Sequence, residues 1–136
     1  MSEQIAVNAH EIISRELGDS IQSRMMSYGY WGECTSYRRA PMFSAMRNNV
    51  AIVHNTYECS SKGTGVEMLI LVVEDDNGKC RATILYESTP EENIHIALND
   101  MKVQKAVAGY YIEYTFSSGG PVGGQPWRKT EKIRFI

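Results

Sequence analysis

The sequence predicts an α+β fold, in which helices pack on a single, mainly antiparallel, five-stranded sheet. Three observations support this class. Apolar residues recur at helical spacing near the N-terminus, strand-like segments are joined by turn sequences, and a capping motif between them indicates one inserted helix. The expected order is one or two helices, three strands, a helix and two strands, in one domain spanning residues 1–136.

The N-terminal segment has the apolar spacing of an amphipathic helix, carried by Ile5, Ala9, Ile12, Ile13 and Leu17. Gly18 interrupts this pattern, and Asp19 or Ser20 can cap a second short helix. One kinked helix and two consecutive helices therefore both fit. Residues 29–49 mix aromatic and arginine side chains without a clear period, so we expect an irregular connection with a helical turn at 42–48.

Three strands are expected at 50–58, 66–73 and 80–87, forming an antiparallel meander. The segment 66–73 is apolar on both faces, which is typical of a central strand. Asn77-Gly78 is a strong hairpin signal, because both residues tolerate positive φ.

The inserted helix is expected to begin at Thr89-Pro90-Glu91-Glu92, a sequence that combines an N-cap hydroxyl, a proline at the first helical position and a carboxylate three residues after the cap. One face of this helix would continue through Ile94, Leu98, Met101 and Lys105, and the helix would end at Gly109. The alternating segments 110–116 and 127–136 then predict a closing hairpin.

Composition narrows the classes of function. The formal net charge is −2, which argues against binding of long nucleic acids, but residues 127–136 hold four basic side chains against one glutamate. The longest strongly apolar run, 68–73, is too short to span a bilayer. Three scattered cysteines and no recognisable secretory signal favour reduced thiols in the cytoplasm.

The glycine-rich loop between the last two strands is the first candidate ligand site. Gly119, Gly120, Gly123 and Gly124 leave backbone amides accessible to phosphate oxygens, and Trp127, Arg128 and Lys129 follow. The loop lacks the Lys-Ser/Thr ending of a nucleotide P-loop, and a strand follows it rather than a helix. A flexible hairpin tip without a ligand is the alternative.

A second candidate region combines aromatic and guanidinium side chains, namely Trp31, Tyr37, Arg38 and Arg39. Aromatic rings stack on nucleobases and arginine binds phosphate in a bidentate manner. The alternative is that these rings bridge the N-terminal helices to the sheet while the arginines stay solvated.

No catalytic or metal-binding signature is present. His10, His54 and His95 lie far apart, and no pair has the spacing of a zinc site, although His54, Cys59 and Cys80 can meet on adjacent strands. No nucleophile elbow or acid–base pair is evident, so an enzyme is the least favoured reading and no cofactor is expected.

The sequence therefore favours a non-enzymatic protein that binds a small anionic, nucleotide-like ligand and thereby senses or sequesters a signal molecule. The alternative is an interaction or inhibitor module that docks its basic C-terminal hairpin on an acidic protein partner. The closing strand should lie at a sheet edge, where it invites pairing with a second copy, so a homodimer or higher homo-oligomer is expected.

Overall fold

The computed structural model describes residues 2–27, 37–47, 49–59, 64–88, 95–119 and 125–136, with side chains for 8–27, 49–57, 66–88, 95–119 and 125–136. These residues form one helix and seven strands, ordered α1 (Ser2–Ser27), β1 (Tyr37–Arg47), β2 (Val50–Cys59), β3 (Thr64–Glu74), β4 (Cys80–Glu87), β5 (Ile96–Lys105), β6 (Tyr110–Ser118) and β7 (Trp127–Phe135).

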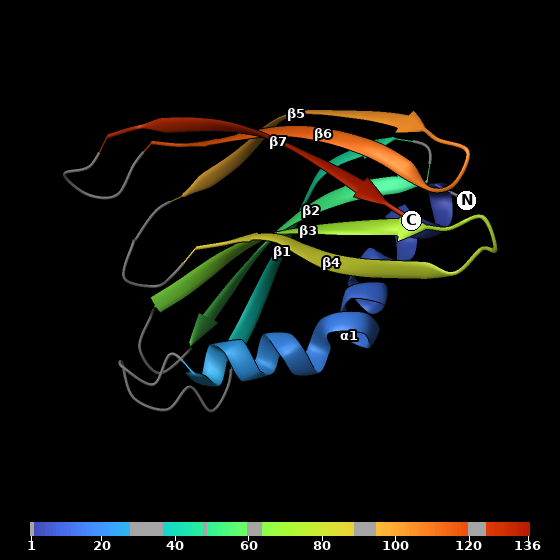
Figure 1. The fold of residues 1–136 in the computed structure, drawn as a ribbon. Helices are drawn as coiled ribbons and strands as arrows, with labels where there is room; N and C mark the ends of the chain where they lie inside the picture. The colour runs from blue at the N-terminus through green and yellow to red at the C-terminus, as the bar shows by residue number, and fades with distance from the viewer. Residues whose placement is uncertain (1, 28–36, 48, 60–63, 89–94, 120–124) are drawn as a thin grey trace.

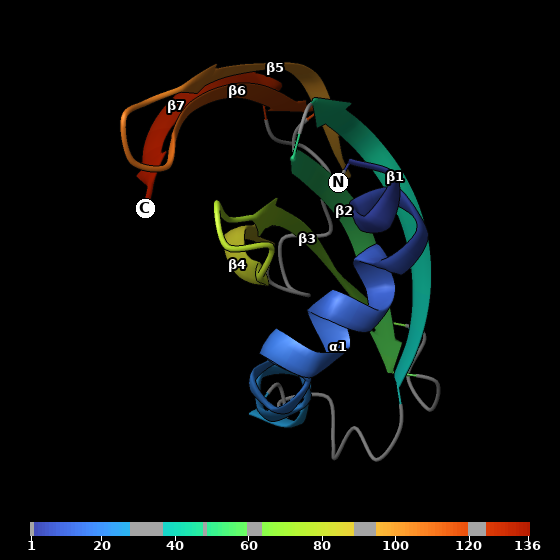
Figure 2. The ribbon, with the colours of Figure 1, turned by 90° about the vertical axis from the view of Figure 1, so that its right-hand side faces the viewer.

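The strands form two separate antiparallel sheets, so the prediction of a single five-stranded sheet was wrong. One sheet has the order β1-β2-β3-β4 and the other the order β5-β6-β7. Figure 1 shows three layers, with the three-stranded sheet above the four-stranded sheet and α1 beneath it. β5 contacts β1 and β2, and the sheets approach each other along that side (Figure 2).

Two hydrophobic clusters hold these layers together. Ile13 and Met25 of α1 pack against Val53, Met68 and Ile70 on one face of the four-stranded sheet. On its other face, side chains of β2 and β3 pack against the three-stranded sheet, among them Ile52, Leu69, Leu71, Ile112 and Phe116. β3 is thus buried on both faces, which confirms the prediction for residues 66–73.

The predicted meander is confirmed, since β2, β3 and β4 pair antiparallel in sequence. Gly78 has a φ of 79° in the β3–β4 turn, as expected for the second residue of an Asn-Gly pair. The closing hairpin is also confirmed, with Tyr110 opposite Phe135 and Ser118 opposite Trp127. β7 lies at the edge of its sheet, as predicted.

The inserted helix was a wrong prediction, because residues 96–105 form strand β5. Its register shifts between Leu98 and Asp100, so an extra residue separates two inward-facing side chains, Leu98 and Met101. The bulge gives a strand the three-residue apolar spacing that is typical of a helix. The capping motif at 89–92 lies outside the described residues.

The N-terminal part of the chain differs from the prediction at two places. The proposed irregular segment with a helical turn at 42–48 was wrong over 37–47, because these residues form strand β1. Pro41 is accommodated there because β1 is an edge strand. The N-terminal residues form a single helix that continues through Gly18, rather than two helices.

Gly109 should be far less tolerant of a side chain than Gly78, although both have positive φ. A Cβ at Gly109 would lie 1.9 Å from the Phe135 carbonyl oxygen, whereas a Cβ at Gly78 would meet nothing within 4 Å. We expect Gly78→Ala to lower the free energy of unfolding by about 1 kcal/mol through backbone strain alone. Gly109→Ala should cost about 2 kcal/mol because the clash adds to that strain. If urea denaturation shows equal losses of unfolding free energy for the two variants, the clash at Gly109 has no effect on stability.

Candidate functional site

The outer face of the three-stranded sheet, which points away from the four-stranded sheet, is the first candidate site. Side chains alternate along a strand, so the neighbours of the buried Ile112 point outward. By register, this face carries four basic and two acidic side chains: Lys102, Arg128, Lys132 and Arg134, with Asp100 and Glu113. The face therefore has a local positive charge on a chain whose net charge is −2.

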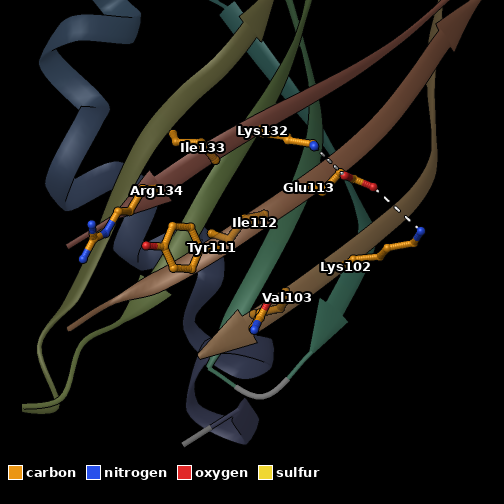
Figure 3. A pocket seen from close by; sticks show the side chains of 9 residues that line it. Lys102, Val103, Tyr111, Ile112, Glu113, Lys132, Ile133 and Arg134 are labelled. Atoms are coloured by element: carbon orange, nitrogen blue, oxygen red, sulfur yellow. Dashed lines mark ion pairs between the residues drawn. The ribbon is translucent and has the colours of Figure 1, made fainter. Parts of the chain in front are cut away.

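A shallow hollow of about 680 Å³ lies on this outer face (Figure 3). Its lining residues come from all three strands and include both outward-facing and inward-facing positions. Its lining comprises Lys102, Val103, Gln104, Tyr111, Ile112, Glu113, Lys132, Ile133 and Arg134. The volume is in the range of pockets that hold small organic ligands.

The hollow combines an aromatic ring with weakly paired cations. Tyr111 is 48% exposed, and the Arg134 guanidinium carbon lies 5.1 Å from its ring centroid. Glu113 lies between Lys102 and Lys132, and each Nζ is 3.7 Å from a carboxylate oxygen. These separations are too long for hydrogen bonds, so the two ammonium groups can reorient towards a ligand.

The structure separates two of the residues predicted to bind phosphate together. Arg128 and Lys129 are adjacent on β7 and so lie on opposite faces, with Arg128 opposite Ser117 on the outer face. The Lys129 ammonium lies 4.9 Å from the ring centroid of Trp127. Trp127 is half-buried and contacts the rings of Tyr86 and Phe116 in the aromatic cluster between the sheets. A ligand on either face of β7 would therefore meet only one of the two cations.

The remaining predicted site residues are distributed over other parts of the fold. Gly119 is exposed directly after β6. Tyr37, Arg38 and Arg39 belong to β1, where their register partners are Cys59, Glu58 and Tyr57. They thus lie in the four-stranded sheet, whereas Arg128 and Lys129 lie in the other sheet. The residues that the structure describes do not include Trp31, Gly120, Gly123 and Gly124.

A buried carboxylate at one end of the sandwich forms a second feature, which the sequence analysis missed. Glu67 on β3 accepts hydrogen bonds from His54 Nε2 (2.7 Å), His95 Nδ1 (2.8 Å) and the backbone N–H of Ile96 (3.1 Å). We call this group the Glu67 network. It joins the two sheets, because Ile96 begins β5 and Glu67 and His54 belong to the four-stranded sheet.

The Glu67 network favours the ionised carboxylate. Burial raises the pKa of Glu67, but the hydrogen bonds from His54, Ile96 and His95 together outweigh this effect, so the pKa lies below its ordinary value. A carboxylate can only accept hydrogen bonds, so each histidine directs an N–H at it. The signal available in the sequence was a single glutamate within an apolar segment buried on both faces, because such a group requires partners.

The convergence of His54 with Cys59 and Cys80 that was considered from the sequence does not form. His54 faces the three-stranded sheet, whereas Cys80 packs in the cluster on the α1 side, so the two lie on opposite faces of their sheet. Over the described part of the chain, no three His, Cys, Asp or Glu side chains are placed to hold a metal ion. Within that same part, no helix has the length and apolar character needed to cross a membrane.

Comparisons with protein-family models, with curated proteins and with solved structures found no match to this chain.

Proposed function

We propose that the protein binds a small anionic ligand with an aromatic ring, such as a mononucleotide, in the hollow on the outer face of the three-stranded sheet. The observation that supports this proposal most directly is the pairing of the exposed Tyr111 ring with the Arg134 guanidinium at the rim of the hollow. An aromatic base can stack on either group, since both present flat surfaces.

The charges around the hollow suit an anion attached to such a base. Lys102, Lys132 and Arg134 line it, and Glu113 is the acidic side chain among the lining residues. Binding of a phosphate would replace the loose 3.7 Å ion pairs with shorter, charge-assisted hydrogen bonds. Glu113 would then be free to accept hydrogen bonds from a base.

Arg134 and Arg128 provide a matched test of where the ligand binds. Both belong to β7 and occupy outer-face positions, but only Arg134 lines the hollow. Native mass spectrometry and calorimetry with AMP and GMP should show that Arg134→Ala and Tyr111→Ala each weaken binding about tenfold. Arg128→Ala should change the affinity less than about twofold, because a single exposed charge acts weakly at a distance.

Three outcomes would contradict this proposal. The first is that neither mononucleotide binds the wild-type protein. The second is that Arg128→Ala reduces affinity as much as Arg134→Ala. The ligand would then bind at the end of the β6–β7 hairpin that adjoins the glycine-rich loop. The third is that inorganic phosphate alone binds as tightly as the mononucleotides and is insensitive to Tyr111→Ala, because the aromatic ring would then have no role.

A further inference from the structure

His95 combines an exposed ring with a buried and fixed carboxylate partner. Its side chain is 92% exposed, whereas that of Glu67 is 8% exposed, and its Nδ1 lies 2.8 Å from Glu67 Oε2. The other carboxylate oxygen is held by His54 and by the backbone N–H of Ile96. The carboxylate therefore keeps its position while the imidazole remains accessible to reagents from solvent.

This geometry determines which ring nitrogen of His95 can react. Because Nδ1 donates its proton to Glu67, the neutral ring carries its lone pair on Nε2. A carboxylate on the far nitrogen fixes the tautomer and raises the basicity of the ring. It also stabilises the positive charge that develops on the imidazole when Nε2 forms a bond.

The other two histidines lack this combination. His54 hydrogen-bonds to the same carboxylate but is only 6% exposed, between the two sheets. His10 lies half-buried on α1, away from the Glu67 network. Among the three histidines, His95 is the most exposed, and its orientation is fixed by Glu67.

An exposed cation, Arg128, lies at the same end of the three-stranded sheet as His95. His95 directly precedes β5, whose first residue Ile96 is opposite Ser118, which in turn is opposite Trp127. The adjoining outer-face row is Ala97, Ser117 and Arg128, so the exposed Arg128 lies at the same end of the sheet. Guanidinium groups bind phosphoryl compounds in preference to neutral acyl donors, which makes a phosphoryl donor the reagent class to test first.

We propose that His95 accepts a phosphoryl group on Nε2 from a small reactive donor of the acyl phosphate or phosphoramidate class. The Nε2 lone pair attacks phosphorus, a new N–P bond forms, and the bond from phosphorus to the leaving group breaks. The leaving group departs with that electron pair, as a carboxylate from an acyl phosphate or as ammonia from phosphoramidate. The Nδ1 proton stays in its hydrogen bond to Glu67. This site lies at the opposite end of β5 and β6 from Tyr111 and does not depend on the proposed nucleotide hollow.

Phosphoramidate is the probe that tests this proposal without any substitution. The native protein and the protein unfolded in urea are incubated with it, and phosphorylation at each histidine is followed by mass spectrometry under alkaline conditions. We expect His95 to react at least about tenfold faster in the native protein than in the unfolded chain, where the three histidines lose their different surroundings. His10 should show no such acceleration.

Two variants test whether the reactivity of His95 depends on its hydrogen bond to Glu67 or on its exposure alone. Glu67→Gln should slow the reaction of His95 about tenfold, because the carboxylate that stabilises the charged ring is lost. His10→Gln should leave the rate at His95 unchanged. The proposal is overturned if native His95 reacts no faster than in the unfolded chain. It is equally overturned if folded Glu67→Gln reacts at the wild-type rate, which would make exposure alone sufficient.

Discussion

Replacing Glu67 with alanine should lower the free energy of unfolding by about 3 kcal/mol, measured by urea denaturation near neutral pH. The substitution leaves the buried His54 ring and the Ile96 amide without their acceptor, and the loss of one member of a buried charged network typically has this cost. The effect should exceed that of an ordinary surface carboxylate because the side chain of Glu67 is 8% exposed.

Glu113 is a matched control for Glu67, since it also lies between two basic side chains, in this case Lys102 and Lys132 of the neighbouring strands. Its ion pairs are 3.7 Å long and its side chain is 34% exposed. Exposed ion pairs of this kind contribute little to stability, so Glu113→Ala should cost less than about 1 kcal/mol. Equal losses for the two substitutions would show that the Glu67 network contributes no more than a surface pair.

The free energy of unfolding at acidic pH should depend on the same network, because the charge of Glu67 depends on pH. Its pKa is lowered in the folded protein from the ordinary value of 4.5, so its contribution to stability is fully present above that value. The contribution is lost as the pH falls through the lower folded pKa. Glu67→Gln should therefore lose less stability than the wild type between neutral and acidic pH. Parallel curves of unfolding free energy against pH for the two proteins would contradict this account.

The short-range features of the sheets were predictable because they depend on neighbouring residues. Asn77-Gly78 between two strand-like segments correctly predicted the β3–β4 turn, and two alternating segments joined by a glycine-rich loop correctly predicted the pairing of β6 with β7. Strand β5 was not predictable in this way. Its bulge places Leu98 and Met101 three residues apart, and that spacing imitates a helical face.

The division into two sheets depends on contacts between distant segments, which local patterns do not encode. Residues 89–105 were expected to cover a sheet as a helix, whereas residues 96–105 begin a second sheet and pack against the first. The same limit applies to the sites. Glu67 meets His95, 28 residues away, only because the fold brings the beginning of β5 against β3. Arg128 and Lys129 look like a pair in sequence, yet strand geometry places them on opposite faces.

Shortening single buried side chains of β3 should show whether α1 and the two sheets unfold as one unit. Ile70 faces α1 and Leu71 faces the three-stranded sheet, and both are fully buried. Each replacement by alanine should lower the free energy of unfolding by about 3 kcal/mol, through lost apolar burial and the cavity that remains. Val103→Ala is a suitable control, because Val103 is only half-buried at the margin of the same cluster as Leu71, and should cost about 1 kcal/mol.

Two optical probes report on different layers during this unfolding. Circular dichroism follows α1, and fluorescence in a Trp31→Phe background follows Trp127 of the three-stranded sheet. Because β3 contributes to the clusters on both sides of its sheet, Leu71→Ala should shift the midpoints of both probes equally. A shift of the Trp127 signal with an unchanged helical transition would mean that the three-stranded sheet detaches on its own.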